Sequence, residues 1–85
     1  MFVKINDKYD LLYQLSKARE DFVIHYRCFN CGDEQVTYEH NTFDADRLIG
    51  EIETQGYITL GHSCTNCGRI TRILSPNCIQ GLETL

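Results

Sequence analysis

The sequence predicts a small α+β domain made of two units, each with the order helix, strand, cysteine turn and strand. The motif Cys-x-Asn-Cys-Gly occurs twice, at 28–32 and 64–68, and we call the two copies the first and the second knuckle. Residues that alternate between apolar and polar, as in strands, flank both knuckles. Residues with the apolar spacing of an amphipathic helix come before each of these stretches. At 85 residues the chain fits one domain, 1–85, with no linker inside it.

Two helices are predicted from apolar residues that recur at helical spacing. The first covers about 6–20, and either Asn6 or Asp7 can cap its beginning. The second covers about 44–55, with Gly56 at the position where helices commonly end. Each helix has one apolar stripe that is expected to face the core. The stripes consist of Leu11, Leu12, Leu15 and Ala18 in the first helix and of Ala45, Leu48, Ile49 and Ile52 in the second.

The strands are predicted on both sides of each knuckle, and a short strand opens the chain. In the strand before the first knuckle, Phe22, Ile24 and Tyr26 share one face, and in the strand after it Val36 and Tyr38 share one face. The expected strands are 2–5, 21–28, 34–40, 57–64 and 69–74. We therefore divide the chain into an N-terminal strand and helix (1–20), a ribbon with an inserted helix (21–75) and a C-terminal tail (76–85) too short to assign.

The cysteines of the two knuckles have the spacing of metal ligands. Two residues between a pair of cysteines let both thiolates reach one ion from a tight turn, and the following glycine allows the positive φ of such a turn. One pair cannot complete a tetrahedral shell, but two pairs form the Cys₄ set of a structural zinc site. The predicted ligands are Cys28, Cys31, Cys64 and Cys67. In a reducing compartment this pattern indicates a metal site before disulfides, which are the alternative.

Two CxxCG turns, each between two strands, resemble the zinc-ribbon and rubredoxin-like proteins over about 22–74. The resemblance implies one ion held by the four cysteines, which is a structural zinc in a ribbon and an electron-carrying iron in a rubredoxin. The chain departs from the rubredoxin pattern, because Thr65 stands where rubredoxins usually have proline and a helix separates the two knuckles. Zinc is therefore the expected cofactor, and a rubredoxin-like electron carrier is the less favoured alternative.

The fifth cysteine and the three histidines are weaker candidates. We expect Cys78 to be a buried small residue or an idle thiol, with a redox-sensing thiol or a substitute ligand as alternatives. His25 and His62 come shortly before a cysteine pair, where either is an alternative ligand or a hydrogen-bonding neighbour of the site. His40 lies in an acidic, turn-like segment and is expected to be solvated.

The acidic residues are gathered between the knuckles. The net charge is −4, and the segment 28–60 carries seven acidic residues against the single basic residue Arg47. Four of the seven lie on the second predicted helix and are our candidates for a partner-binding surface. These are Asp44, Asp46, Glu51 and Glu53. We expect the partner to be another protein, because proteins that bind nucleic acid usually show a basic footprint. The alternative is a nucleic-acid-binding ribbon that uses Arg27, Arg69 and Arg72.

None of the patterns typical of catalysis is found in the sequence. It has no nucleophile-and-base motif, no phosphate-binding glycine loop and no HExxH, so we expect no enzymatic activity. The absence of an apolar run of about 20 residues and of a secretory signal at the start predicts a cytoplasmic protein without a membrane span. The expected function is that of a small zinc-binding adaptor or inhibitor, such as the regulators that phages direct at host nucleic-acid enzymes. The sequence leaves the oligomeric state open.

Overall fold

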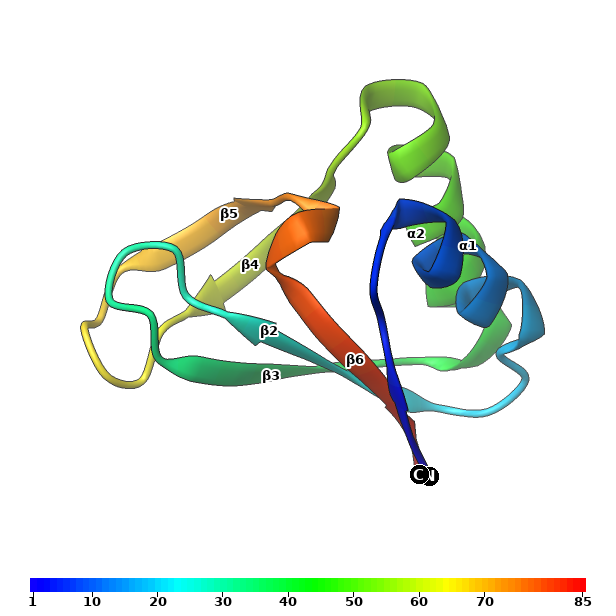
Figure 1. Cartoon of the computed structure of the whole chain (residues 1–85), viewed down its shortest axis with the longest axis horizontal. Coiled ribbons are helices and arrows are strands. Elements are labelled where there is room, and N and C mark those ends of the chain that lie inside the picture. Colours follow the sequence, from blue (N-terminus) through cyan, green and yellow to red (C-terminus); the bar gives the residue numbers. More distant parts are fainter.

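The computed structural model describes the backbone of residues 1–85 and all side chains except those of His62, Thr71 and Arg72. Each knuckle lies between two antiparallel strands, and each of these hairpins follows a helix, in the order predicted from the sequence (Figure 1). The elements are β1 (Phe2–Lys4), α1 (Lys8–Lys17), β2 (Phe22–Arg27), β3 (Glu34–Glu39), α2 (Asn41–Gln55), β4 (Ile58–Ser63), β5 (Ile70–Leu74), the 3-10 turn η1 (Pro76–Cys78) and β6 (Ile79–Thr84).

Helix α1 is capped by Asp7, one of the two residues expected there. The Asp7 Oδ1 atom accepts a hydrogen bond from the Asp10 N–H at 2.8 Å, which satisfies one of the free N–H groups of the first turn. The helix ends at Lys17, earlier than the expected Glu20, because Ala18 leaves the helical conformation at φ −66° and ψ 126°. The predicted stripe faces the core. Its members Leu11, Leu15 and Ala18 are buried and Leu12 is partly buried.

Helix α2 begins at Asn41, earlier than expected. The Asp44 Oδ2 atom accepts a hydrogen bond from the His40 N–H at 2.6 Å, as acidic side chains of a first helical turn often do. Asp44 therefore lies in the first turn, as predicted, although the helix begins three residues before it. The helix ends as predicted at Gly56, whose φ of 85° is left-handed. The predicted stripe is buried at Ala45, Leu48 and Ile52 and partly buried at Ile49.

The larger sheet has the strand order β1-β6-β2-β3, and all neighbouring strands in it are antiparallel. No element was predicted for 76–85, whereas β6 lies there, in the middle of the sheet between β1 and β2 (Figure 1). The ring of Phe2 occupies the space that a side chain at Gly81 would need. The position of β6 therefore depends on its pairing with β1 and β2, and not on an alternation of apolar and polar residues within β6. This explains why the sequence pattern did not predict the strand.

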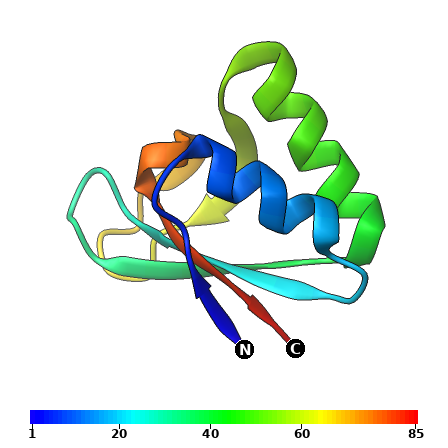
Figure 2. The same cartoon turned by 45° about the vertical axis from the view of Figure 1, so that its right-hand side comes forward.

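Helices α1 and α2 cover one face of this sheet, which we call the inner face (Figure 2). On β2 the inner face carries Phe22, Ile24 and Tyr26, each at most 1 % exposed, as the alternation predicts. The β4–β5 hairpin forms a separate two-stranded sheet. It adds three apolar side chains to the same core, namely Ile58, Leu60 and Leu74. No helix in the described residues has the length and apolar content that crossing a lipid bilayer requires.

Strand β3 turns its polar residues inward and its apolar residues outward. The β2–β3 register places Gln35, Thr37 and Glu39 on the inner face, opposite the buried residues of β2. Gln35 and Glu39 are only 6 % and 7 % exposed. Val36 and Tyr38 lie on the opposite, outer face and are 37 % and 68 % exposed. The two apolar residues do share one face as predicted, but this face is not covered by a helix.

The buried polar side chains of β3 are satisfied by distant parts of the chain. Gln35 Oε1 accepts hydrogen bonds from the N–H and the hydroxyl of Thr65, both at 3.2 Å. Glu39 forms an ion pair with Arg47 of α2 at 3.5 Å. Burial, together with the charge of Asp44, raises the pKa of Glu39 above its usual value. These contacts fix the second knuckle and helix α2 against β3.

Candidate metal centre

The first knuckle is a tight turn that ends the β2–β3 hairpin. The Cys28 N–H donates to the carbonyl of Asp33, and the Gly32 N–H donates to the carbonyl of Cys28, both at 2.8 Å. Gly32 has a φ of 77°, which residues with a Cβ rarely adopt. The glycine of the motif is therefore required by the conformation of the turn.

The second knuckle has the same conformation at the end of the β4–β5 hairpin. The Cys64 N–H donates to the carbonyl of Arg69, and the Gly68 N–H donates to the carbonyl of Cys64, both at 2.9 Å. Gly68 has a φ of 74°. The repeat in the sequence is thus also a repeat of the backbone structure.

The four cysteines of the knuckles bring their sulfur atoms into one cluster. All four Sγ atoms lie within 4.8 Å of one another. Across the knuckles, Cys28 lies 3.9 Å from Cys67 and Cys31 lies 3.6 Å from Cys64. Four sulfurs placed tetrahedrally at about 2.3 Å from one zinc ion would be about 3.8 Å apart. A disulfide needs about 2.05 Å, and all five cysteines of the chain are free. The predicted ligands therefore form a cluster consistent with a metal site.

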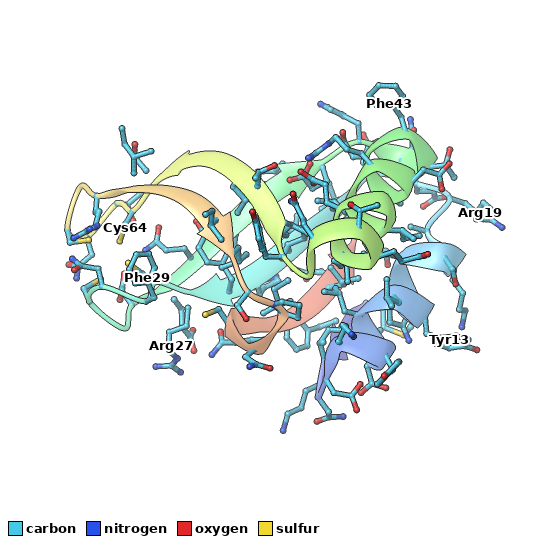
Figure 3. All side chains as sticks on the ribbon, turned by 90° about the horizontal axis from the view of Figure 1, so that it is seen from above. Tyr13, Arg19, Arg27, Phe29, Phe43 and Cys64 are labelled. Atoms are coloured by element: carbon cyan, nitrogen blue, oxygen red, sulfur yellow. The ribbon has the colours of Figure 1, made fainter. Side chains whose placement is uncertain are left out.

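The cluster lies at the boundary between the core and the solvent. Cys28 and Cys64, the first cysteine of each pair, are each 2 % exposed, whereas Cys31 and Cys67 are exposed. Figure 3 shows Cys64 and Phe29 at the same end of the molecule, away from the helices. An ion held by these sulfurs would link the two hairpins and still be accessible from one side.

The asparagines of the two knuckles make reciprocal hydrogen bonds to the cysteines of the opposite knuckle. Asn30 Nδ2 donates to Cys67 Sγ at 3.5 Å, and the Asn66 side chain donates to the thiol of Cys31. Arg69 Nη1 donates to Asn30 Oδ1 at 3.4 Å. Since a guanidinium can only donate, this contact orients the amide with its NH₂ group toward the sulfur. This role of the asparagines was not predicted, although the asparagine present in both copies of the motif was the signal for it.

These hydrogen bonds favour the thiolate form of the exposed cysteines. The bond from Asn30 and the backbone N–H of Arg69 lower the pKa of Cys67 to about 6. In the same way, the bond from Asn66 and the backbone N–H of Asp33 lower the pKa of Cys31. Thiolates are the form that binds metals, so the reciprocal asparagines prepare the cluster for a cation.

An aromatic and an arginine side chain meet beside the cluster. Phe29, the variable residue of the first knuckle, is 63 % exposed, and the guanidinium of Arg69 lies 5.7 Å from the centre of its ring. Arg27 donates to the carbonyl of Gly32 at 3.1 Å. Two of the three arginines proposed for nucleic-acid binding thus lie at this end, and the side chain of the third, Arg72, lies outside the described residues.

The other candidate residues of the sequence analysis do not join the cluster, as far as their side chains are described. His25 lies on the outer face of the sheet, where its Nε2 is 3.0 Å from Glu83 Oε1. Cys78 is partly buried against the core. His40 is exposed at the start of α2. The side chain of His62 lies outside the described residues.

The four acidic residues proposed for partner binding differ in their surroundings. Asp44 and Glu51 form ion pairs with Arg47 at 3.7 and 2.9 Å, and Glu51 also accepts a hydrogen bond from the hydroxyl of Thr59 on β4. Two of the acids therefore hold α2 together and connect it to β4. The other two, Asp46 and Glu53, are exposed.

The candidate metal centre consists of two hairpin turns of equal conformation, four clustered thiols and two asparagines that bridge the turns. Comparisons of the chain with protein-family models, with curated proteins and with solved structures return no match.

Proposed function

We propose that the chain binds one zinc ion through Cys28, Cys31, Cys64 and Cys67, and that this ion stabilises the fold. The observation that carries the proposal is the cluster of four Sγ atoms within 4.8 Å of one another. Four thiolates fill the coordination sphere of zinc and leave no position for water or substrate. Such an ion has a structural role and catalyses no reaction.

The position of the cluster explains why the fold would need the ion. The β2–β3 hairpin belongs to the larger sheet and the β4–β5 hairpin to the smaller one. Among the described side chains, hydrogen bonds from the two knuckle asparagines, from Arg69 to Asn30 and from Thr65 to Gln35 connect these hairpins. Structural zinc contributes about 10–16 kcal/mol of apparent binding energy in zinc-finger peptides, which is comparable with the whole stability of a small domain.

Metal analysis of the purified chain, expressed in medium with zinc or with iron, tests this proposal. We expect one zinc ion per chain and a lower melting temperature after chelation. A ferric tetrathiolate spectrum with reversible reduction would instead support the rubredoxin-like alternative. A metal-free chain with unchanged stability would refute the metal site.

We further propose that the protein acts by binding another protein, as an adaptor or inhibitor, and not as an enzyme. The exposed acids Asp46 and Glu53 support this proposal, because they give helix α2 a free negative surface. Several aromatic side chains on the surface also support it, since tyrosine is common among the residues that dominate interface energies. The most exposed tyrosines are Tyr9 (72 %), Tyr38 (68 %) and Tyr13 (60 %).

A pull-down from the source cells, with nuclease treatment before elution, tests the protein-binding role. We expect a protein to be retained after nuclease treatment. If α2 faces the partner, replacing Asp46 and Glu53 by lysine should weaken binding while the zinc content stays at one. Salt should slow association as well, because it screens charges beyond a Debye length of about 8 Å at physiological ionic strength.

One observation favours nucleic acid as a second candidate partner. The Phe29–Arg69 pair beside the cluster combines an exposed ring with a guanidinium 5.7 Å away, and such pairs can stack on single-stranded bases. In this case Arg69→Ala should abolish binding, and lysine at positions 46 and 53 should strengthen it. The same two sets of variants therefore separate the two candidate functions.

A further inference from the structure

Strand β3 forms one edge of the larger sheet and is six residues long, Glu34–Glu39. The strand at the other edge, β1, has only three residues. A long free edge presents unpaired main-chain groups, and many proteins protect such edges because another strand can pair with them. The residues of β3 that face the free edge decide what this edge can bind.

The hydrogen-bond pattern shows which residues these are. In an antiparallel pair, opposite residues alternate between bonded and non-bonded pairs. The Cys28 N–H donates to the Asp33 carbonyl, so this pair is bonded and the next pair, Arg27 and Glu34, is not. If this alternation continues along the β2–β3 register, the main-chain N–H and C=O groups of every second residue of β3 point away from β2. These residues are Glu34, Val36 and Tyr38.

Two observations agree with this assignment. His40, the next residue of the same series, directs its N–H away from β2 and donates it to Asp44 of α2. In the described part of the chain, no main-chain hydrogen bond outside the strand ladders involves Glu34, Val36 or Tyr38. The edge is therefore closed at its C-terminal end by α2 and open over three alternate residues.

The space beside these residues is open. A groove of about 310 Å³ runs along β3 and is lined by residues 34–38 and by Thr65 of the second knuckle. The side chains of Val36 and Tyr38 border it on the outer face and are 37 % and 68 % exposed. An added strand would find main-chain partners, two apolar side chains and free space at the same place.

We propose that this edge binds an extended segment of a partner protein, which adds to the sheet as an antiparallel strand beside β3. This inference rests on the proposed protein-binding function and names the surface that carries it. In an antiparallel strand, the residues opposite Tyr38, Val36 and Glu34 follow one another at every second position. Cross-strand preferences then select apolar or aromatic residues for the first two positions and a basic residue for the third. The recognised pattern is apolar-x-apolar-x-basic.

The charge around the edge selects a basic partner over a second copy of the chain. Residues 28–60 carry seven acids against Arg47. The side chain of Glu34 is 75 % exposed, and its contact with Arg27 is long, at 4.0 Å. Two copies that paired about Val36 would place Glu34 opposite the partner's Tyr38, without a counter-charge. Each copy also has a net charge of −4. A basic peptide strand meets neither obstacle and is attracted by the field of the acids.

The probe for this proposal is a labelled peptide, acetyl-Gly-Val-Thr-Ile-Thr-Lys-Lys-amide, added to the zinc-loaded protein. We expect saturable binding by fluorescence anisotropy. In amide NMR spectra, the N–H signals of Glu34, Val36 and Tyr38 should shift and become protected from hydrogen exchange. A peptide in which glutamate replaces both lysines should not bind. No binding of the lysine peptide, or shifts confined to another surface, would overturn the proposal.

A proline substitution tests the main-chain contact directly. Val36→Pro removes an N–H that faces the free edge and spares the ladder to β2, and proline is tolerated at such edge positions. We expect it to weaken binding by about fivefold or more, since one hydrogen bond contributes about 1 kcal/mol. The matched control is Lys4→Pro, because the same alternation, fixed by the Ile5–Gln80 bond, points Lys4 away from β6. Unchanged affinity of a folded Val36→Pro protein would refute the proposal.

A second variant keeps the test valid if Val36→Pro does not fold. Glu34→Lys leaves the backbone unchanged and should reverse the preference, so that the glutamate peptide binds better than the lysine peptide. Equal preference would refute the antiparallel register. Sedimentation that shows a dimer, with protected β3 amides in the absence of peptide, would assign the edge to a second copy. A protein retained in the pull-down that binds the Val36→Pro variant as tightly as wild type would refute only the placement of the binding surface on β3. The absence of any protein partner would refute the proposed function.

Discussion

Replacing the asparagine of either knuckle should weaken zinc binding by about tenfold, and by a similar factor for both. Asn30 Nδ2 lies 3.5 Å from Cys67 Sγ on an exposed part of the molecule. Hydrogen bonds to charged groups contribute about 1.5–3 kcal/mol, and this long, solvated contact belongs at the lower end. A loss of about 1.4 kcal/mol corresponds to a tenfold change in affinity. Asn66→Ala removes the equivalent bond to Cys31 and should have the same effect.

Competition with a chromophoric chelator measures these affinities in zinc-loaded protein. The cobalt-substituted protein provides an independent signal, because a thiolate that loses a hydrogen bond donates charge more readily and its charge-transfer band moves to lower energy. Asn30→Asp should weaken binding more than Asn30→Ala, since a carboxylate cannot donate to the sulfur and adds a repulsive charge. Asn6→Ala replaces an exposed asparagine outside both knuckles and is the matched control.

Zinc affinities of both alanine variants within twofold of wild type would refute this role of the asparagines. A loss of affinity in only one variant would show that the two bonds are not equivalent, although they have the same place in the two knuckles. The double variant has a further use. The two asparagines contact different sulfurs, so a deviation from additive losses measures how strongly the shared ion couples the knuckles.

Three further predictions concern the cysteines and the glycines. Cys78→Ser should leave one zinc per chain and nearly the same melting temperature, whereas Cys64→Ser should lower both values. Metal analysis and calorimetry measure them. Loss of zinc in the Cys78 variant alone would mean that the proposed ligand set is wrong. Zinc affinity should rise from about pH 6 to about pH 9, because metal and protons compete for the thiolates. The pKa of Cys64 is raised to about 11, so the Cys64 thiol must lose its proton when the metal binds. The pKa of Cys67 is lowered to about 6, so this thiol is already largely ionised. Titrations in which the zinc affinity does not change with pH would contradict this prediction. Gly50→Ala, at an exposed position in α2 with open space around it, should stabilise the protein by about 0.5–1 kcal/mol in urea unfolding, whereas Gly56→Ala should destabilise it because of the φ of 85°.

The sequence was sufficient for the parts of the fold that depend on local patterns. Helical periodicity identified both helices and their buried stripes, and the repeated motif identified the four cysteines that the structure brings together. The glycines of the knuckles were also explained correctly, because a positive φ is a local property of the turn. The helix boundaries were predicted less accurately, because they depend on the backbone conformation at the helix ends. The first helix ends before Ala18, and the second begins at Asn41, three residues before Asp44.

The parts that the sequence did not reveal depend on contacts between distant residues. The polar inner face of β3 follows from partners far along the chain, Thr65 for Gln35 and Arg47 for Glu39. Without these partners, buried polar side chains would be costly and the pattern would favour a different orientation of the strand. The bond from Asn30 to Cys67 spans the two knuckles, so it has no local signature except the repetition of the motif.

The central position of β6 has a consequence for the time course of synthesis. Strand β6 follows all other strands in the sequence, yet it separates β1 from β2 in the larger sheet. While the chain is being made, β1 therefore has no strand to pair with until residues 79–84 have left the ribosome, although all four clustered cysteines are already present by Cys67. If the four cysteines bind a metal ion as proposed, this ion can hold the two hairpins together before β6 pairs with β1 and β2.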